Sequence, residues 1–152
     1  MTRLTLHDIK HDNILIAEDA NGDLLTYHIV LIDFGKATGL QSGRHYTLSE
    51  REKIEYLVKY PYIAPEVVHG EYKQSTHSDM YSIGIVFRKI SDGNHFSSLP
   101  SKTIHDLKEL FERCTSVRYL RRPVQVNAWK SLTNYFNTNK YTVTVLTLVK
   151  KL

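Results

Sequence analysis

The chain has 152 residues, of which 41% are hydrophobic and 24% are charged, a composition typical of one globular domain rather than of a disordered or fibrous chain. Its net charge of +4 is too small to imply nucleic-acid binding, and the basic residues from Arg113 to Arg122 are not interleaved with a series of aromatic side chains. No apolar run is long enough to cross a membrane, no secretory signal is recognisable and the single cysteine, Cys114, excludes an intramolecular disulfide, so we expect a cytoplasmic protein.

The first predicted elements are two short strands joined by a turn. Residues 14–17 and 28–32 are short apolar runs, and the Asn21-Gly22 pair between them is a strong turn signal. The polar residues 33–48 that follow predict an irregular loop. We therefore expect a small β-hairpin near the N-terminus.

A helix is predicted after this loop. Ser49 and Glu52 have the spacing of a capping box, and Ile54, Leu57 and Val58 form an apolar stripe behind it. Proline residues at positions 61 and 65 end this helix, and a short helix begins at residue 66.

Three further helices are expected. Residues 79–90 carry apolar side chains around most of the helix circumference, as in a buried helix, and Asp79 could cap its N-terminus. Ser101 could cap the next helix, which includes Cys114 as a buried core residue. A last helix is expected around Trp129. The chain is thus predicted to be mainly α-helical with one small β-hairpin.

The candidate catalytic and metal-binding residues are polar residues at positions 8–13 and 33. Asp8 is followed by Lys10 and Asn13, and Asp33 follows the second predicted strand. Phosphoryl transfer needs a carboxylate that accepts the hydroxyl proton, a cation near the transferred phosphate and oxygen ligands for Mg²⁺. Asn13 and Asp33 could supply those oxygen atoms, because Mg²⁺ takes few protein ligands beside phosphate oxygens.

Five motifs in the correct order make the chain resemble the protein kinase family. The residues 6–13 (LHDIKHDN) resemble the catalytic loop H-R-D-x-x-x-x-N, and Asp33-Phe34-Gly35 resembles the magnesium-binding element. Ala64-Pro65-Glu66 resembles the end of the activation segment, and residues 78–84 resemble the start of the buried central helix. Arg122-Pro123 resembles the arginine that pairs with the glutamate of that segment.

The resemblance implies a role for each matching residue. Asp8 would be the catalytic base, Lys10 would stabilise the transferred phosphate, Asn13 and Asp33 would bind Mg²⁺, and Leu15 would lie under the adenine ring of ATP. The lysine two residues after the aspartate resembles the pattern of serine/threonine kinases rather than that of tyrosine kinases. Structural roles would fall to Phe34, Gly35, Glu66, Asp79 and Arg122, with Asp79 bound to the catalytic-loop backbone and Glu66 paired with Arg122.

Some residues depart from the family pattern. Leu6 and His7 replace its histidine and arginine, so the arginine that reads a phosphorylated activation loop is absent. Leu6 could still fill the apolar spine beside Phe34. Val58 and Lys59 replace a glycine and a threonine, which weakens the serine/threonine assignment.

The resemblance covers only the C-terminal lobe of the family's fold, which is mainly α-helical with a small hairpin. Residues 1–133 are expected to form this partial kinase domain, followed by an atypical tail at 134–152. No glycine-rich loop, strand lysine or helix glutamate precedes the catalytic loop. We expect the missing N-lobe to lie upstream in a longer form, and this chain to be inactive alone.

The sequence therefore predicts an ATP- and Mg²⁺-dependent kinase acting on serine or threonine of protein substrates, with neither nucleic acid nor a membrane as a partner. One alternative is a C-lobe retained as a non-catalytic, pseudokinase-type binding module. Another is a small-molecule phosphotransferase, which residues 64–66 and 78–84 disfavour. A zinc site at His7 and His11 is disfavoured because the loop runs directly into a strand.

Overall fold

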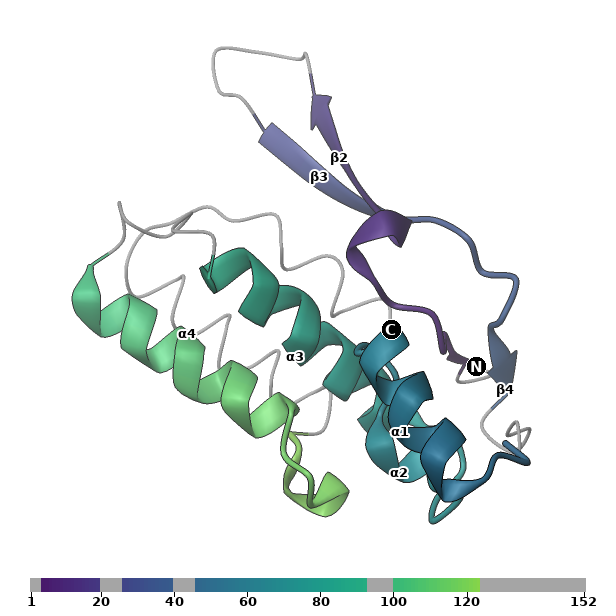
Figure 1. Cartoon of the computed structure of the whole chain (residues 1–152). Coiled ribbons are helices and arrows are strands. Elements are labelled where there is room, and N and C mark those ends of the chain that lie inside the picture. The colour runs from purple at the N-terminus through teal and green to yellow at the C-terminus, as the bar shows by residue number, and fades with distance from the viewer. Residues whose placement is uncertain (1–3, 20–25, 40–45, 93–99, 124–152) are drawn as a thin grey trace.

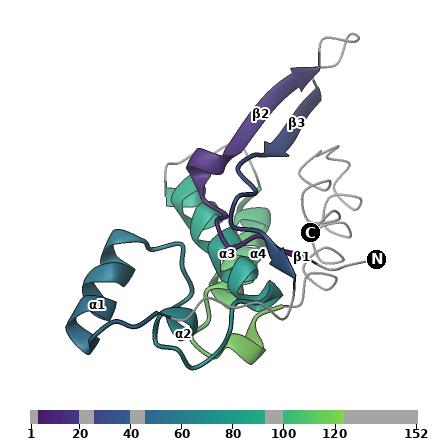
Figure 2. The same cartoon turned by 90° about the vertical axis from the view of Figure 1, so that its right-hand side faces the viewer.

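The computed structural model describes residues 4–19, 26–39, 46–92 and 100–123, which form a β-hairpin beside a helical body (Figure 1). Helices α3 (Thr76–Asp92) and α4 (Ser101–Cys114) pack side by side, and the hairpin projects away from them. A quarter turn shows α1 (Glu50–Lys59) standing apart from this helix pair (Figure 2). The mainly helical fold with a small hairpin is thus confirmed.

The hairpin consists of β2 (Ile14–Asp19) and β3 (Thr26–Leu31), which pair antiparallel. Ile14 pairs with Leu31 at one end and Asp19 with Thr26 at the other. Both predicted strands are therefore present, although their bounds differ by one to two residues at most ends. The predicted Asn21-Gly22 turn lies outside the described residues.

A second, smaller strand pair was not predicted. Strand β1 (Leu4–Thr5) pairs antiparallel with β4 (Thr38–Gly39), inside the stretch predicted to be an irregular loop. Two-residue strands are too short to show the alternation by which a strand is recognised in a sequence. The pair matters because it brings the segment after Asp33 back beside the residues that precede Asp8.

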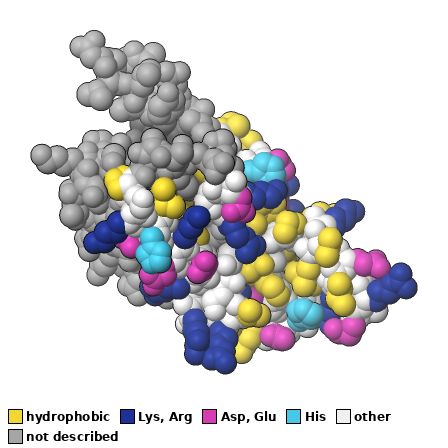
Figure 3. All heavy atoms as spheres, turned by 60° about the vertical axis from the view of Figure 1, so that its left-hand side comes forward, with side chains coloured by type: hydrophobic (Ala, Val, Ile, Leu, Met, Phe, Trp, Pro, Cys, Tyr) yellow, Lys and Arg dark blue, Asp and Glu magenta, His cyan; other side chains and the backbone are white. Residues whose placement is uncertain are grey.

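Helix α1 begins as predicted. The Ser49 backbone nitrogen donates to Oε2 of Glu52 at 2.8 Å, and the Ser49 hydroxyl accepts from the Glu52 backbone nitrogen at 3.4 Å, which completes the capping box. Two residues of the predicted apolar stripe face solvent, since Ile54 is 63% and Val58 is 78% exposed, whereas Leu57 is half-buried. The face of the molecule drawn in Figure 3 has hydrophobic side chains interspersed with charged side chains of both signs.

Helix α3 begins at Thr76, so the prediction that Asp79 caps its N-terminus is wrong. Two serines satisfy backbone groups there instead: the Ser75 backbone nitrogen donates to Oγ of Ser78 at 2.9 Å, and the His77 nitrogen donates to Oγ of Ser75 at 3.2 Å. Asp79 lies within the first turn and is buried, which leaves its carboxylate available to another part of the chain.

The prediction that Ser101 caps α4 is also wrong. Ser101 is the first helical residue, and Pro100 takes the capping position without a side-chain hydrogen bond. The helix buries one face against α3, where Phe111 stacks on Phe87 with ring centroids 4.3 Å apart. Cys114 is 1% exposed, which confirms the predicted core position.

The core joins the helices to the predicted catalytic loop. Its buried cluster contains Ile9, Met80, Ile83, Val86 and Cys114, so one residue of that loop packs directly against α3. Three short elements complete the fold: α2 (Pro65–Val68) and the 3-10 turns His11–Asn13 and Tyr119–Arg121. The expected helix around Trp129 and the tail lie outside the described residues. None of the described helices is long and apolar enough to cross a membrane.

Candidate active site

Asp8 lies between two lysine side chains. The Nζ atom of Lys36 is 2.9 Å from Oδ1 of Asp8, and Nζ of Lys10 is 3.9 Å from Oδ2. The Asp8 side chain is 15% exposed, whereas those of Lys10 and Lys36 are 33% and 44% exposed. A carboxylate with two cations beside it, still reached by solvent, can accept a proton from a hydroxyl group brought to it.

Asn13 is buried beside Asp8. It ends the 3-10 turn, and its amide nitrogen donates to the Asp8 backbone oxygen at 2.9 Å and more weakly to Oδ2 at 3.3 Å. The Asn13 backbone oxygen accepts from the Ile32 nitrogen at 2.9 Å. Because the amide nitrogen is used for these contacts, the side-chain oxygen is the atom that Asn13 can offer to a metal ion.

Asp33 follows the hairpin in a left-handed backbone conformation, with φ of 61°. Aspartate tolerates this region better than most residues, because its short side chain can hydrogen-bond locally. Here Oδ1 accepts from the Gly35 backbone nitrogen at 3.3 Å. The carboxylate is exposed and follows directly on Ile32, the residue that hydrogen-bonds to Asn13.

Asp79 holds the backbone of the predicted catalytic loop. Its two carboxylate oxygens accept hydrogen bonds from the backbone nitrogens of Leu6 at 2.8 Å and His7 at 2.9 Å. Burial raises the pKa of Asp79, and these two bonds oppose the rise. The contact is the one that the resemblance implies, and it ties the residues before Asp8 to helix α3.

His7 links the same loop to β4. It has a φ of 62°, and its Nε2 atom lies 2.7 Å from Oγ1 of Thr5 and 2.6 Å from Oγ1 of Thr38. The imidazole thus joins two strands, in the position where the family has an arginine.

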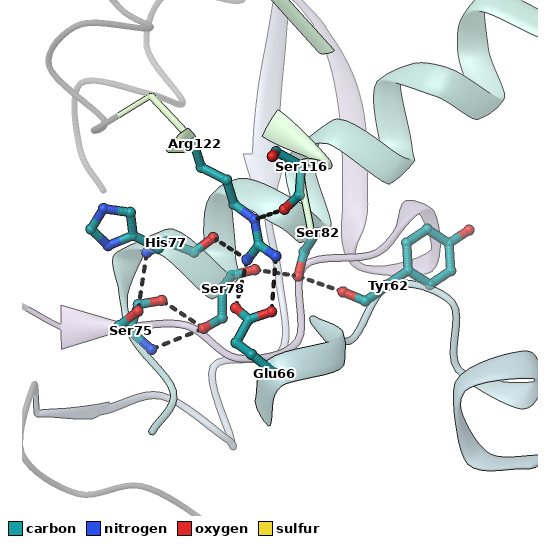
Figure 4. Close-up of polar contacts among 8 residues, drawn as sticks. All are labelled: Tyr62, Glu66, Ser75, His77, Ser78, Ser82, Ser116 and Arg122. Atoms are coloured by element: carbon teal, nitrogen blue, oxygen red, sulfur yellow. Dashed lines mark hydrogen bonds and ion pairs between the residues drawn. The ribbon is translucent and has the colours of Figure 1, made fainter. Parts of the chain in front are cut away.

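A buried ion pair joins α2 to the segment that follows α4. Nη1 and Nη2 of Arg122 donate to Oε1 and Oε2 of Glu66 at 2.6 and 2.8 Å (Figure 4). Arg122 also donates to the backbone oxygens of Ser116 at 2.8 Å and His77 at 3.2 Å. These bonds join α2, the start of α3 and the segment after α4, and Glu66 and Arg122 are paired as the resemblance implies.

The end of the segment from Asp33 to Glu66 is attached to α3 by Ser82. The Ser82 hydroxyl lies 2.7 Å from the Tyr62 backbone oxygen and 3.1 Å from that of Ser78 (Figure 4). The Tyr62 hydroxyl in turn lies 2.5 Å from Nδ1 of His11. This chain of contacts connects the segment to the loop that carries Asp8.

The two predicted site residues with large apolar side chains, Leu15 and Phe34, lie at the surface. Leu15 on β2 is 50% exposed and Phe34 is 56% exposed. Leu6 packs against the core cluster, and it lines a shallow pocket together with Phe34. The other residues that line the pocket are Asp8, Ile9, Leu31, Ile32 and Asp33. Phe34 therefore lies beside Leu6 at a pocket rather than inside the apolar core.

Lys36 is a residue of the site that was not predicted from the sequence. This residue directly follows Asp33-Phe34-Gly35, and its short ion pair with Asp8 depends on the fold of the loop between β3 and β4. The one signal in the sequence that could have indicated Lys36 is its position directly after the motif that contains Asp33. Such a signal is weak, because lysine is common in exposed loops.

The donor set fits Mg²⁺ better than a protein-only metal cage. Within the described ranges, no group of three or more His, Cys, Asp or Glu side chains is arranged to hold a metal ion. Asn13 and Asp33 offer one amide oxygen and one carboxylate. Two such oxygen donors suit Mg²⁺, which commonly keeps water and phosphate oxygens as its remaining ligands.

Comparison with known proteins supports the same family. The protein kinase domain matches residues 2–151. The probable serine/threonine-protein kinase PBL20 of Arabidopsis thaliana is 28% identical over 147 residues, which are 95% of this chain and 32% of that protein. Cyclin-dependent kinase C-2 of Arabidopsis thaliana is 30% identical over 110 residues, which are 72% of this chain and 19% of that protein. The chain spans about a third or less of these relatives' lengths. No solved structure matches it.

Proposed function

The chain belongs to the protein kinase family, and from this premise we propose that it carries the catalytic loop and metal ligands of a site that transfers the γ-phosphate of ATP to a protein serine or threonine. The observation that carries the proposal is the environment of Asp8. Its carboxylate is reached by solvent, lies beside Lys10 and Lys36, and is joined to Asn13.

Asp8 is the proton acceptor in the proposed reaction. As the acceptor hydroxyl attacks, its O–H bond breaks and the proton passes to the Asp8 carboxylate. The oxygen forms a bond to the γ-phosphorus, and the bond from that phosphorus to the bridging oxygen breaks, so ADP leaves with the electron pair. Lys10, whose ammonium group lies 3.9 Å from the same carboxylate, would stabilise negative charge on the transferred phosphate.

Asn13 and Asp33 are the proposed magnesium ligands. When bound, Mg²⁺ neutralises charge on the phosphates of ATP. Asn13 is fixed by its bonds to Asp8, whereas the exposed Asp33 is oriented by the turn to Gly35. The Ile32–Asn13 backbone bond keeps the two ligand segments beside each other.

The hairpin side of the site has an exposed apolar surface, which we propose a further lobe covers. Exposed apolar side chains gather on and after the hairpin strands, namely Leu15, Val30, Ile32 and Phe34. We propose that a segment with the glycine-rich loop and the ATP-binding lysine covers this surface, with Leu15 under the adenine ring. None of the 152 residues supplies these parts before the catalytic loop, so this chain alone is proposed to transfer no phosphate.

The proposed assignment to serine and threonine rests on Lys10 and on the names of the relatives. PBL20 is named as a probable serine/threonine-protein kinase, and 95% of this chain aligns with it. The substrate is accordingly proposed to be a protein.

The test is transfer of labelled γ-phosphate from ATP to casein by the longest translated form of the protein. We expect Mg²⁺-dependent transfer, and loss of both transfer and Mg²⁺-dependent nucleotide binding in Asp33→Asn. The matched control is Asp12→Asn, whose side chain is 63% exposed and contacts His11. A protein that binds no nucleotide and transfers no phosphate would instead be a non-catalytic binding module, and the proposal would be wrong.

A further inference from the structure

Lys36 makes the shortest charged contact with Asp8 in the part of the chain that the structure describes. Its Nζ atom lies 2.9 Å from Oδ1, one ångström closer than Lys10 lies to Oδ2. The Asp8 side chain is only 15% exposed, so this contact is less screened by water than an ion pair between two surface groups. A charge-assisted N⁺–H···O⁻ contact of this length is stronger than a hydrogen bond between two neutral groups.

The backbone that carries Lys36 is tied to the loop of Asp8 on both sides. Before it, the Ile32 nitrogen donates to the Asn13 oxygen at 2.9 Å, and after it, Oγ1 of Thr38 contacts Nε2 of His7 at 2.6 Å. Between these points the Ala37 nitrogen donates to the Phe34 oxygen at 2.9 Å, which closes a tight turn. The turn therefore presents residue 36 to Asp8 from an anchored segment.

The two oxygens of Asp8 are left in different situations. Oδ1 is engaged by Lys36 at 2.9 Å, whereas among the residues that the structure describes Oδ2 has the weak contact to Asn13 at 3.3 Å and the distant Lys10 at 3.9 Å. Oδ2 therefore keeps more capacity to accept a hydrogen bond. It is also the oxygen beside Lys10, the residue assigned to the transferred phosphate.

We propose that Lys36 is a positioning residue for the catalytic base: its ammonium group holds Oδ1 of Asp8 so that Oδ2 receives the proton of the acceptor hydroxyl. This inference rests on the proposed phosphoryl transfer. It adds a role, for a residue just after the Asp33-Phe34-Gly35 element, that acts on the carboxylate and not on ATP.

The experiment measures kcat and the KM for ATP in the longest translated form of the protein. Lys36→Met keeps the aliphatic side chain and removes the charge, and we expect kcat to fall about ten- to a hundredfold because the base is misplaced. The KM for ATP should stay within about twofold, because the lost interaction acts in the transition state. Lys36→Arg should restore most of kcat, because it restores the cation.

The matched control is Lys53→Met, which removes a lysine that pairs with Glu50 at 2.6 Å on α1, away from Asp8. We expect its kcat to stay within about twofold of wild type. Thermal unfolding gives a second readout: Lys36→Met should lower the Tm less in an Asp8→Asn background than in wild type, as expected for interacting residues.

The outcomes separate the two proposals. A wild-type protein that transfers no phosphate overturns the proposed function, and the role of Lys36 with it. In a protein that does transfer phosphate, an unchanged or raised kcat in Lys36→Met overturns only the role of Lys36. A change confined to the KM for ATP, or an equal loss of kcat in Lys36→Arg, overturns it as well.

Discussion

Glu66 and Arg122 form a bidentate ion pair in the interior, with N···O distances of 2.6 and 2.8 Å across 56 residues of sequence. The side chains are 5% and 0% exposed. The guanidinium group also lies over the Tyr81 ring, 4.8 Å from its centroid. Arg122 thereby fastens the segment that follows α4 to the end of the segment that begins at Asp33.

Removing one member of this pair should destabilise the fold strongly. Arg122→Met leaves the Glu66 carboxylate buried without its cation, which costs about 3–5 kcal/mol in the free energy of unfolding. The double variant Glu66→Gln/Arg122→Met should be more stable than Arg122→Met, because it no longer buries an unpaired charge. Urea unfolding measures both, and a double variant less stable than Arg122→Met would contradict the account.

Among the glycines that the structure describes, Gly84 on α3 leaves the least room for an added side chain. A Cβ atom there would lie 2.8 Å from Cβ of Cys114 and from Cγ2 of Thr115. Gly84→Ala should therefore lower the free energy of unfolding by about 1–3 kcal/mol through overpacking, despite alanine's better helix propensity. Gly39→Ala is the control, because its Cβ would meet no atom within 4 Å. Equal stability of the two variants in urea would refute the close packing.

Much of the candidate site could be predicted from the sequence because its residues lie in short motifs. Asp8, Asn13 and Asp33 are close in sequence or follow a recognisable strand, and the Glu66–Arg122 pair came from matching motifs. Lys36 was missed because its approach to Asp8 depends on the β1–β4 pair, which is too short to leave a pattern. The contact of Asp79 with the loop was predicted from the resemblance. Its position was predicted as the N-cap of α3, but it lies within the first turn, because Ser75 and Ser78 satisfy backbone groups at the start of the helix.

The titration of Asp79 should affect stability. Burial raises its folded-state pKa above the ordinary value of 3.8, so the folded protein binds this proton more tightly than the unfolded chain does. Its contribution to the free energy of unfolding is therefore fully present below pH 3.8 and is lost as the pH rises through the raised pKa. Relative to Asp79→Asn, wild type should lose stability across that window in urea unfolding. If the free energy of unfolding of wild type instead rose with pH relative to that of Asp79→Asn, the prediction would be wrong.

Cys114 should be chemically inert while the protein is folded. It is 1% exposed, and burial raises the pKa of its thiol to about 12, so little of the reactive thiolate is present at pH 8. We expect Ellman's reagent to modify it at pH 8 only after urea unfolding. Rapid modification of the native protein would show that the α3–α4 contact is open.

The most direct measurement of the central claim is kcat for phosphate transfer by Asp8→Asn and Asp12→Asn in the longest translated form of the protein. Both changes remove one carboxylate from the same loop, but only Asp8 contacts Lys36 and Asn13. We expect Asp8→Asn to lower kcat by at least about a hundredfold and Asp12→Asn to leave it within about twofold. Equal activity of the two variants, or full activity of Asp8→Asn, would contradict the assignment of Asp8 as the base.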